Sequence, residues 1–394
     1  MRGGPQIESR GERQAAAAVK GLRYASATSC RAHSAAVTEF GAVGDGATSN
    51  TAAFRAAVGN LSQYSAAGRG GGMLSFTLFL HRDAVILASQ DINEWPIIDP
   101  LPSYGRGRDK PGGRYSSLIG GSNLTDVIIT GDNGTIDGQG ATWWQKFHKN
   151  QLKYTRGYLI ELMHSDQIII SNLTLLNSPA WNIHPVYSSN IIVSGITILA
   201  PVHSPNTDGI NPDSCSHVRI EDCYIVSGDD CVAIKSGWDE YGIAYGMPSQ
   251  HITAPGRGAY VKDVFVRGMS LDTMKWVFWM TGNYKSHPDG NYNPNAMPVV
   301  NGVSYSNVVA TGVTTAARLE GIPGAPFTGI CISNVTVELA KSRKVSWTCT
   351  DVEGVSADVS PAPCAPLQGA HDGPCPFPAD RLPIDEIEFK ECSY

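Results

Sequence analysis

Long apolar stretches, basic runs and a helical hydrophobic period are all missing from this chain of 394 residues. No apolar stretch approaches the ~20 residues of a membrane span. The net charge of −6 is small for this length, and no basic–aromatic patch occurs, so nucleic acid is not an expected partner. Residues 1–29 lack the apolar core of a signal peptide, and we expect them to form an unstructured N-terminal segment.

Glycine and proline are abundant instead. The 42 glycines and 24 prolines fit a chain with many turns and few long helices. The best helix candidate is Asn50–Leu61, where Asn50 would be the N-cap of an Ala-rich segment. We expect this helix to cover the open N-terminal end of the fold.

Short β-branched segments with a polar break recur at nearly regular intervals. Each one is bounded by Ser, Asn or Gly and predicts a strand. The first residues of successive segments lie 23, 27, 46 and 66 residues apart, and 46 equals two steps of 23. The segments are Ile168–Leu175, Ile191–Ile198, Val218–Ile225, Val264–Leu271 and Ile330–Val337.

A repeat of this length without helices predicts a β-solenoid. Leucine-rich repeats are excluded because no L-x-x-L-x-L frame recurs, which leaves a single-domain parallel β-helix whose coils stack ~4.8 Å apart. Asp208 in Asn-Thr-Asp-Gly lies 21 residues before the pair Asp229-Asp230, so these carboxylates should lie on neighbouring coils.

Clustered carboxylates suit the hydrolysis of glycosidic bonds. One carboxylic acid protonates the leaving oxygen and another carboxylate activates water, and crowding raises the pKa of one of them. Two other interpretations remain open. Asp-Gly and Asp-Asp also form turns, and clustered carboxylates bind calcium, as a lyase acting on uronates would require.

Cysteines and sequons indicate an oxidising, glycosylating compartment. The chain has nine cysteines and five sequons, at Asn60, Asn123, Asn133, Asn172 and Asn334. Residues 341–394 form a Cys- and Pro-rich tail that contains Cys349, Cys364, Cys375 and Cys392. We expect these four to form two disulfides that hold the tail on the last coils, with the pairing left open.

Two sequence blocks resemble glycoside hydrolase family 28, the polygalacturonases and their relatives. Asn-Thr-Asp-Gly (206–209) is followed by S-G-D-D-C-V-A-I-K-S-G (227–237), and the segments at 40–54, 178–187 and 286–298 are similar to the plant branch or to its N-terminal cap. The resemblance covers about 30–394. It implies a right-handed parallel β-helix, with 30–340 as the glycosidase domain, and inverting hydrolysis of galacturonan or rhamnogalacturonan.

Carried over residue by residue, the resemblance makes Asp229 the general acid and gives Asp208 and Asp230 the task of holding and activating water. Asn206 and Lys235 are candidate substrate-binding residues, although a structural role suits Lys235 equally well. Trp181 and His184 lie one coil before Asp208, and a place in the substrate groove is expected because sugars stack on aromatic rings. No cofactor or metal is expected, and we predict a secreted, cell-wall monomer whose partner is a pectic polysaccharide.

The chain also departs from the family pattern. The Gly-His-Gly and Arg-Ile-Lys motifs that follow the Asp pair in relatives are absent, and a second gap occurs near 70–74. His251 is not flanked by glycines and Arg257 is expected in a loop, so neither is a predicted replacement. We expect residues 241–257 to be irregular and to interrupt the stack of coils, and activity to be impaired.

Two alternatives therefore stay open, a non-catalytic polysaccharide-binding protein and a calcium-dependent pectate lyase. Two weaker expectations concern packing. Trp276 and Trp279 lie in a nearly all-apolar run and are expected in the core. Cys223 is expected to be buried, and Cys215 to pair nearby.

Overall fold

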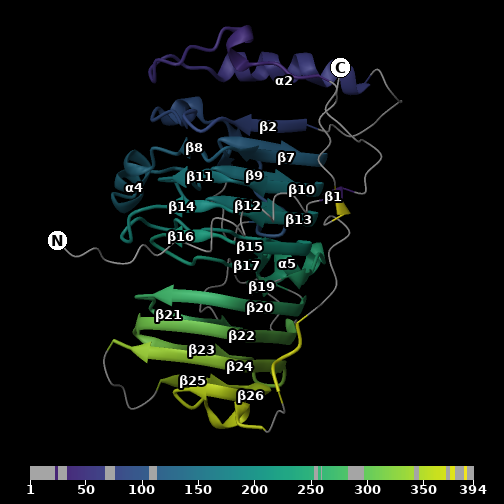
Figure 1. The fold of residues 1–394 in the computed structure, drawn as a ribbon, viewed down its shortest axis with the longest axis vertical. Helices are drawn as coiled ribbons and strands as arrows, with labels where there is room; N and C mark the ends of the chain where they lie inside the picture. Colours follow the sequence, from purple (N-terminus) through teal and green to yellow (C-terminus); the bar gives the residue numbers. More distant parts are fainter. Residues whose placement is uncertain are drawn as a thin grey trace, which may run out of the picture.

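Parallel strands stack in coils along one axis of the computed structural model (Figure 1). The structure describes residues 23–24, 33–66, 76–105, 113–252, 256–258, 260–282, 297–340, 346–369, 373–377 and 386–387. The first side of the solenoid is one ten-stranded sheet. In spatial order its strands are β2 (Phe76–Leu80), β7 (Thr125–Gly131), β10 (Asp166–Ser171), β13 (Ser189–Ser194), β15 (Ser216–Glu221), β18 (Ser249–Ile252), β20 (Tyr260–Asp272), β22 (Val299–Val313), β24 (Phe327–Leu339) and β26 (Val352–Ser360).

The second side is a five-stranded parallel sheet that ends in the middle of the molecule. Its strands are β3 (Val85–Leu87), β8 (Gly134–Asp137), β11 (Leu173–Leu176), β14 (Thr197–Leu199) and β16 (Tyr224–Val226). The third side consists of three shorter sheets. Each of their strands is followed along the chain by a strand of the first side. Its strands are β6 (Ile119–Ser122), β9 (Ile160–Met163), β12 (Ile183–Val186), β17 (Ile234–Ser236), β19 (Gly256–Gly258), β21 (Trp276–Thr281), β23 (Thr315–Glu320) and β25 (Trp347–Thr350).

Left-handed residues form the corners between the first two sides. Asn172, Gly195 and Asp222 have φ angles of 53°, 61° and 51°, a region that Asn, Asp and Gly adopt more readily than other residues. They are the polar breaks in the predicted strands. The prediction of a repeat is therefore confirmed, but in this part of the chain each predicted strand is a pair of strands that meet at a corner.

Equivalent aliphatic residues stack in the interior from coil to coil. Ile170 is in register with Ile129 on one side and with Val193 on the other, and all three are almost fully buried. Burying such side chains stabilises the fold by about 1.5–3 kcal/mol each. The same aliphatic column continues to Ile220, which is in register with Val193.

Helices lie at the end and on the flank of the solenoid. Helix α2 (Thr51–Ala66) covers the N-terminal end, as predicted, and buries Ala53 and Ala57. Asn50 precedes it, but the Asn50 side chain hydrogen-bonds the backbone of Val43 in both directions at 2.9 Å. The other short elements are α4 (Ala141–His148), α5 (Asp239–Tyr245), three 3-10 turns (Val37–Phe40, Ile92–Glu94 and Ala365–Leu367), the antiparallel pair β4 (Ile97–Ile98) and β5 (Arg114–Tyr115), and the pair β1 (Arg23–Tyr24) and β27 (Glu386–Ile387).

The coil that follows the Asp pair is shortened. It contains α5 and the short strands β18 and β19, and β18 pairs with β15 only at Gln250 and Ile252. The second-side sheet stops at β16, and on the third side β19 and β21 belong to separate sheets. The predicted interruption is therefore confirmed on two sides. It is wrong on the first side, where β18 links β15 to β20 and keeps the sheet continuous.

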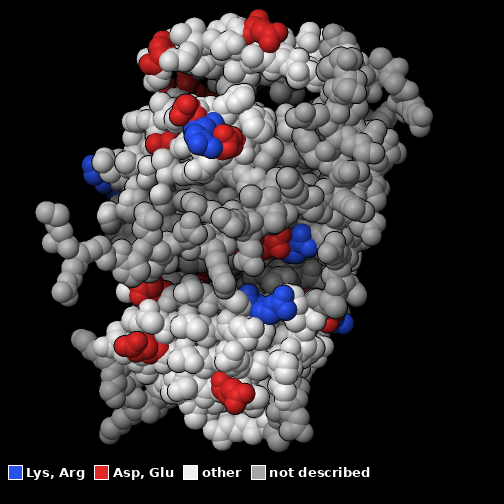
Figure 2. Space-filling view, viewed as in Figure 1, with Lys and Arg blue, Asp and Glu red and all other residues white. Residues whose placement is uncertain are grey.

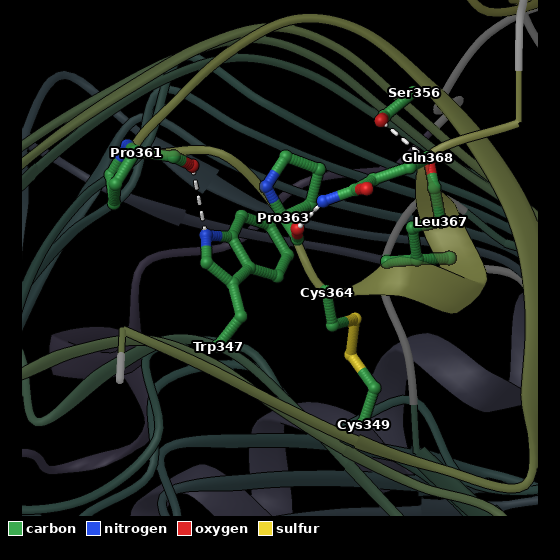
Figure 3. Close-up of a disulfide and its surroundings, with 8 residues drawn as sticks. All are labelled: Trp347, Cys349, Ser356, Pro361, Pro363, Cys364, Leu367 and Gln368. Carbon is green, nitrogen blue, oxygen red and sulfur yellow. Dashed lines mark hydrogen bonds between the residues drawn. A yellow bond between two sulfur atoms is a disulfide. The ribbon is translucent and has the colours of Figure 1, made fainter. Parts of the chain in front are cut away.

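Two disulfides hold the C-terminal part of the chain to the last coils. Cys349 pairs with Cys364, and a 3-10 turn follows that buries Leu367 (Figure 3). Cys375 pairs with Cys331 of β24, which corrects the expectation that the four tail cysteines pair with one another. The tail is thus anchored to the solenoid itself. Cys392 lies outside the described residues, as do 1–22, the gap near 70–74 and most of the 286–298 block.

Charged side chains are scattered over the face shown in Figure 2, where no broad basic patch is seen among the described residues. This agrees with the small net charge. Within the same part of the chain, none of the helices has both the length and the apolar character needed to cross a membrane.

Candidate active site

Asp208 lies where the chain enters the third side of the solenoid. Two residues later, Ile210 bridges to Ile183 of β12, which fixes this segment against the neighbouring coil. The Asp208 side chain is almost fully buried. Its Oδ2 accepts hydrogen bonds from Lys235 Nζ at 3.2 Å and Asn211 Nδ2 at 3.3 Å.

The Asp pair lies on the next coil, directly beside the segment of Asp208. Gly209 N donates to the carbonyl oxygen of Asp230 at 2.9 Å, and Asn206 Nδ2 donates to Asp229 Oδ2 at 3.3 Å. Both acidic side chains are exposed to solvent, in contrast to Asp208. The structure therefore brings the three predicted carboxylates together on neighbouring coils.

The surroundings of the Asp pair raise the pKa values of both of its carboxyl groups. Desolvation and the charge of Asp208 raise the pKa of Asp229. The same two causes, in the same order, raise the pKa of Asp230 to about 6. Because the negative charges repel one another, the carboxyl groups of Asp229 and Asp230 bind a proton more tightly than isolated aspartates do. Such a cluster can hold a proton in mildly acidic solution and release it to a leaving group.

Lys235 is the cation that offsets this crowding. Its ammonium lies 3.2 Å from Asp208 Oδ2 and 4.5 Å from the centre of the Trp181 ring. The Lys235 side chain is 19% exposed, and its charge lowers the pKa values of Asp229 and Asp230. These contacts give Lys235 a structural role in the site. A contact between Lys235 and the substrate stays a prediction.

Arg156 is a site residue that the sequence analysis missed. It is buried, and its Nη1 donates to the carbonyl oxygens of Pro179 and Pro205 at 2.8 Å. Its Nη2 donates to Asn206 Oδ1 at 2.7 Å, so that the Asn206 amide points its NH₂ group at Asp229. A lone arginine directly before the apolar run at Tyr158 was the only signal in the sequence.

Trp181 and His184 do not lie on the surface, which corrects the expectation that they line a substrate groove. Trp181 is 2% exposed and His184 is fully buried. The Trp181 indole stacks on Tyr158 with ring centroids 4.8 Å apart, and both rings contact the His184 imidazole edge to face. Both residues therefore lie in the interior of the solenoid, where Trp181 packs under the Lys235 ammonium.

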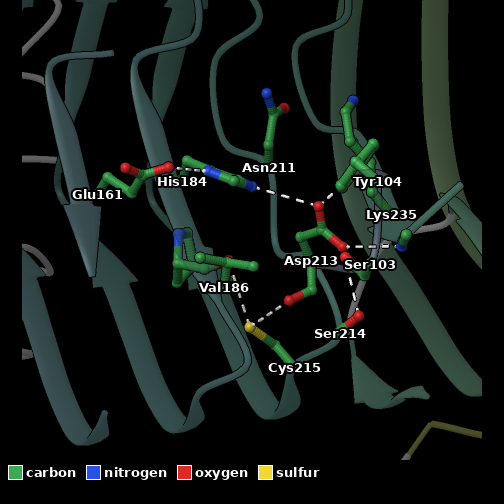
Figure 4. Close-up of polar contacts among 12 residues, drawn as sticks. Ser103, Tyr104, Glu161, His184, Val186, Asn211, Asp213, Ser214, Cys215 and Lys235 are labelled. Atoms are coloured by element: carbon green, nitrogen blue, oxygen red, sulfur yellow. Dashed lines mark hydrogen bonds and ion pairs between the residues drawn. The ribbon is translucent and has the colours of Figure 1, made fainter. Parts of the chain in front are cut away.

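His184 is the centre of a buried polar chain (Figure 4). Its Nδ1 lies 2.9 Å from Glu161 Oε1, and its Nε2 lies 3.3 Å from Asp213 Oδ2. Glu161 also forms a bidentate ion pair with Arg114 at 2.8 and 2.9 Å. The loop that precedes β5 covers this chain, since Tyr104 donates to Asp213 Oδ2 at 2.6 Å.

The remaining expectations are settled only in part. Trp276 and Trp279 are half-buried rather than core residues, and their rings contact each other at 4.7 Å. Cys215 and Cys223 are free thiols, so the pairing expected for Cys215 is wrong. Arg257 lies in β19, in backbone register with Lys235, and not in a loop. The side chains of His251 and Arg257 lie outside the described part of the structure.

Comparisons with known proteins agree with this site. The family model "Glycosyl hydrolases family 28" matches residues 107–248, which include all three aspartates. A probable polygalacturonase of Vitis vinifera is 58% identical over 98% of this chain and 91% of its own length. A probable polygalacturonase of Arabidopsis thaliana is 31% identical, over 60% of this chain and about half (51%) of that protein.

Solved structures show the same architecture. An exopolygalacturonase from Thermotoga maritima superposes with a TM-score of 0.59 at 23% identity, over 83% of this chain and 91% of the other. An endo-xylogalacturonan hydrolase from Aspergillus tubingensis gives a TM-score of 0.51 at 18% identity, over 83% and 95%. The fold is thus the right-handed parallel β-helix expected from the sequence, and the chain belongs to glycosyl hydrolases family 28.

Proposed function

We propose that this protein hydrolyses the α-linked galacturonan backbone of pectin. The observation that carries the proposal is the convergence of Asp208, Asp229 and Asp230 on neighbouring coils, with the pKa values of Asp229 and Asp230 raised. Relatives named polygalacturonase support the choice of substrate. The same names favour hydrolysis over the calcium-dependent lyase reaction.

In the proposed reaction Asp229 donates its proton to the glycosidic oxygen as the bond to the leaving sugar breaks. Asp208 and Asp230 hold a water molecule and accept its proton as the water attacks the anomeric carbon from the opposite face, which inverts the configuration. Lys235 forms an ion pair with Asp208, and Asn206, held by Arg156, orients Asp229. The inverting course is inherited from the family, because carboxylates on adjacent coils alone would suit retention as well.

The missing motifs imply that the chain hydrolyses slowly. The alignment with the Vitis protein has 453 positions but uses about 386 residues of this chain, so roughly 67 positions of the relative have no counterpart here. Three coils of 23 residues would account for them. Loss of a group that supports the acid costs roughly 10²–10⁴-fold, and loss of a charge that stabilises the transition state costs another 10²–10³-fold.

The test compares three proteins and a control variant by reducing-sugar release from de-esterified homogalacturonan and from rhamnogalacturonan. We expect trace activity from the chain as it stands, clear activity when the missing coils are restored, and near-background activity from the restored chain with Asp229→Asn. Asp83→Asn, a change at an exposed turn, is the matched control. Equal activity of the first two proteins would refute impairment, and an inactive restored chain would refute the hydrolase assignment.

A non-catalytic role in binding polysaccharide is the second candidate, and the short coil after the Asp pair favours it. It predicts that the chain is retained on immobilised galacturonan while it releases no reducing ends. Secretion to the cell wall is part of the same proposal, supported by the disulfides Cys331–Cys375 and Cys349–Cys364. Recovery of glycosylated protein from the wall fraction would test it.

A further inference from the structure

Four charged or ionisable side chains form a line under the site. Arg114, Glu161, His184 and Asp213 follow one another across successive coils, and each is at most 2% exposed. Buried charges are costly unless they are paired and hydrogen-bonded. None of the four is exposed enough to touch a polysaccharide, so the proposed reaction gives them no direct role.

Both ring nitrogens of His184 contact carboxylate groups. Each of its ring nitrogens faces a carboxylate oxygen, whereas a neutral imidazole has only one N–H to donate. Asp213 is itself an acceptor, because it receives hydrogen bonds from Tyr104 Oη at 2.6 Å and from Gly237 N at 3.1 Å. A hydrogen on each ring nitrogen would satisfy both contacts, whereas a neutral ring would satisfy only one of them as a donor. With His184 in that state, the line would alternate between guanidinium, carboxylate, imidazolium and carboxylate.

The line reaches the candidate active site by two routes. The His184 ring packs at 4.9 Å against Trp181, whose indole lies 4.5 Å below the ammonium of Lys235. Asp213 is bridged to Lys235 through the backbone, where Lys235 N donates to the carbonyl of Pro212 at 2.9 Å. Lys235 in turn holds Asp208 at 3.2 Å.

We propose that this buried line, with His184 as its central imidazolium, is a positioning device that holds the Lys235 ammonium against Asp208. His184 is a positioning residue and not a catalytic one. The titratable or charged groups that face its ring are Glu161 from β9 and Asp213 from the following coil, with Tyr158 packed on its edge. Only the kinetic consequence of this inference rests on the proposed function.

The first measurement needs no variant. Long-range ¹H–¹⁵N spectra of the histidine rings at pH 8, where a free imidazole is neutral, should show one ring protonated at both nitrogens. That signal should disappear in His184→Gln and persist in His81→Gln, a change at an exposed histidine. Spectra in which every ring has a single N–H would overturn the proposal.

The second measurement follows Lys235 directly. In a crystal structure of His184→Gln, we expect the distance from Lys235 Nζ to Asp208 Oδ2 to exceed 3.5 Å, against 3.2 Å in the unchanged protein. A distance that stays at 3.2 Å would refute the positioning role. Should His184→Gln fail to fold, the ring spectra of the unchanged protein decide alone.

The kinetic arm uses whichever protein hydrolyses, the unchanged chain or the chain with its coils restored. Displacement of a site group by about 1 Å can cost 10²-fold in rate, so we expect kcat to fall about 10²-fold in His184→Gln with KM little changed. An unchanged kcat would contradict the inference. If neither chain hydrolyses, the proposed function fails, whereas the ring spectra and the Lys235 distance still test the positioning role.

Discussion

Replacing Asp230 by asparagine should stabilise the protein above pH 6 while it removes activity. Desolvation and the neighbouring Asp208 raise the pKa of Asp230 from 3.8 to about 6. A raised carboxyl pKa means that the folded state holds its proton more tightly than the unfolded chain. The folded state therefore loses stability as the pH rises from about 4 to 6, and it keeps that loss at higher pH.

The size of the effect follows from the same value. A shift of about two pKa units corresponds to about 3 kcal/mol if the carboxylate is fully shielded from solvent. The Asp230 side chain is exposed, so screening reduces the expected gain to about 1 kcal/mol. Asparagine keeps the shape of the side chain and cannot ionise. The gain should be close to zero at pH 4 and close to its full value at pH 7.5.

Urea unfolding of Asp230→Asn and of the unchanged protein at these two pH values measures the difference. Asp83→Asn, at an exposed turn, is the control and should change stability equally at both pH values. A gain of the same size at pH 4 and pH 7.5 would show that charge crowding is not its cause. A loss at pH 7.5 would show that Asp230 stabilises the fold, and the electrostatic interpretation of the site would then be wrong.

Three further outcomes are expected. Lys235→Met should raise the pKa of Asp230 further and shift the acidic limb of the rate–pH profile upward, whereas Lys235→Arg should leave the limb in place. Cys331→Ser should lower the free energy of unfolding by about 2–4 kcal/mol, while Cys223→Ser, a change at a free thiol, should cost less in the same urea titration. Arg156→Met removes the donor from the buried carbonyl of Pro179 and from the partly buried carbonyl of Pro205, so it should cost about 2–4 kcal/mol. It should lower hydrolysis as well, and unchanged stability would contradict the buried role of Arg156.

Features that repeat in the sequence could be predicted from it. The spacing of Asp208 and Asp229 places them on adjacent coils because one coil uses 20–30 residues, and the polar breaks at Asn172 and Asp222 mark corners that need left-handed residues. The number of coils between the Asp pair and Val264 could also be predicted from the sequence, because the segment is long enough for only one short coil.

Features that depend on distant segments could not be predicted. Asp213, which His184 contacts, is also bonded by Tyr104 from a loop about 80 residues before His184 in the chain. Cys375 finds Cys331, 44 residues away, because the tail folds back over β24. Arg156 reaches Asn206 from two coils away. Nothing in the local pattern of any of these residues identifies its partner.

The first side of the solenoid stays continuous across the shortened coil, because β18 pairs with both β15 and β20. In a fold of this kind, backbone hydrogen bonds can form between any two strands that point aliphatic side chains into the interior. The two strands need not come from coils that follow one another in a longer relative. Whole turns can therefore be lost without exposing the interior, whereas side chains needed for chemistry are lost with them. Folding and catalysis then depend on different residues, so a solenoid of this kind can stay folded when side chains needed for a reaction are lost.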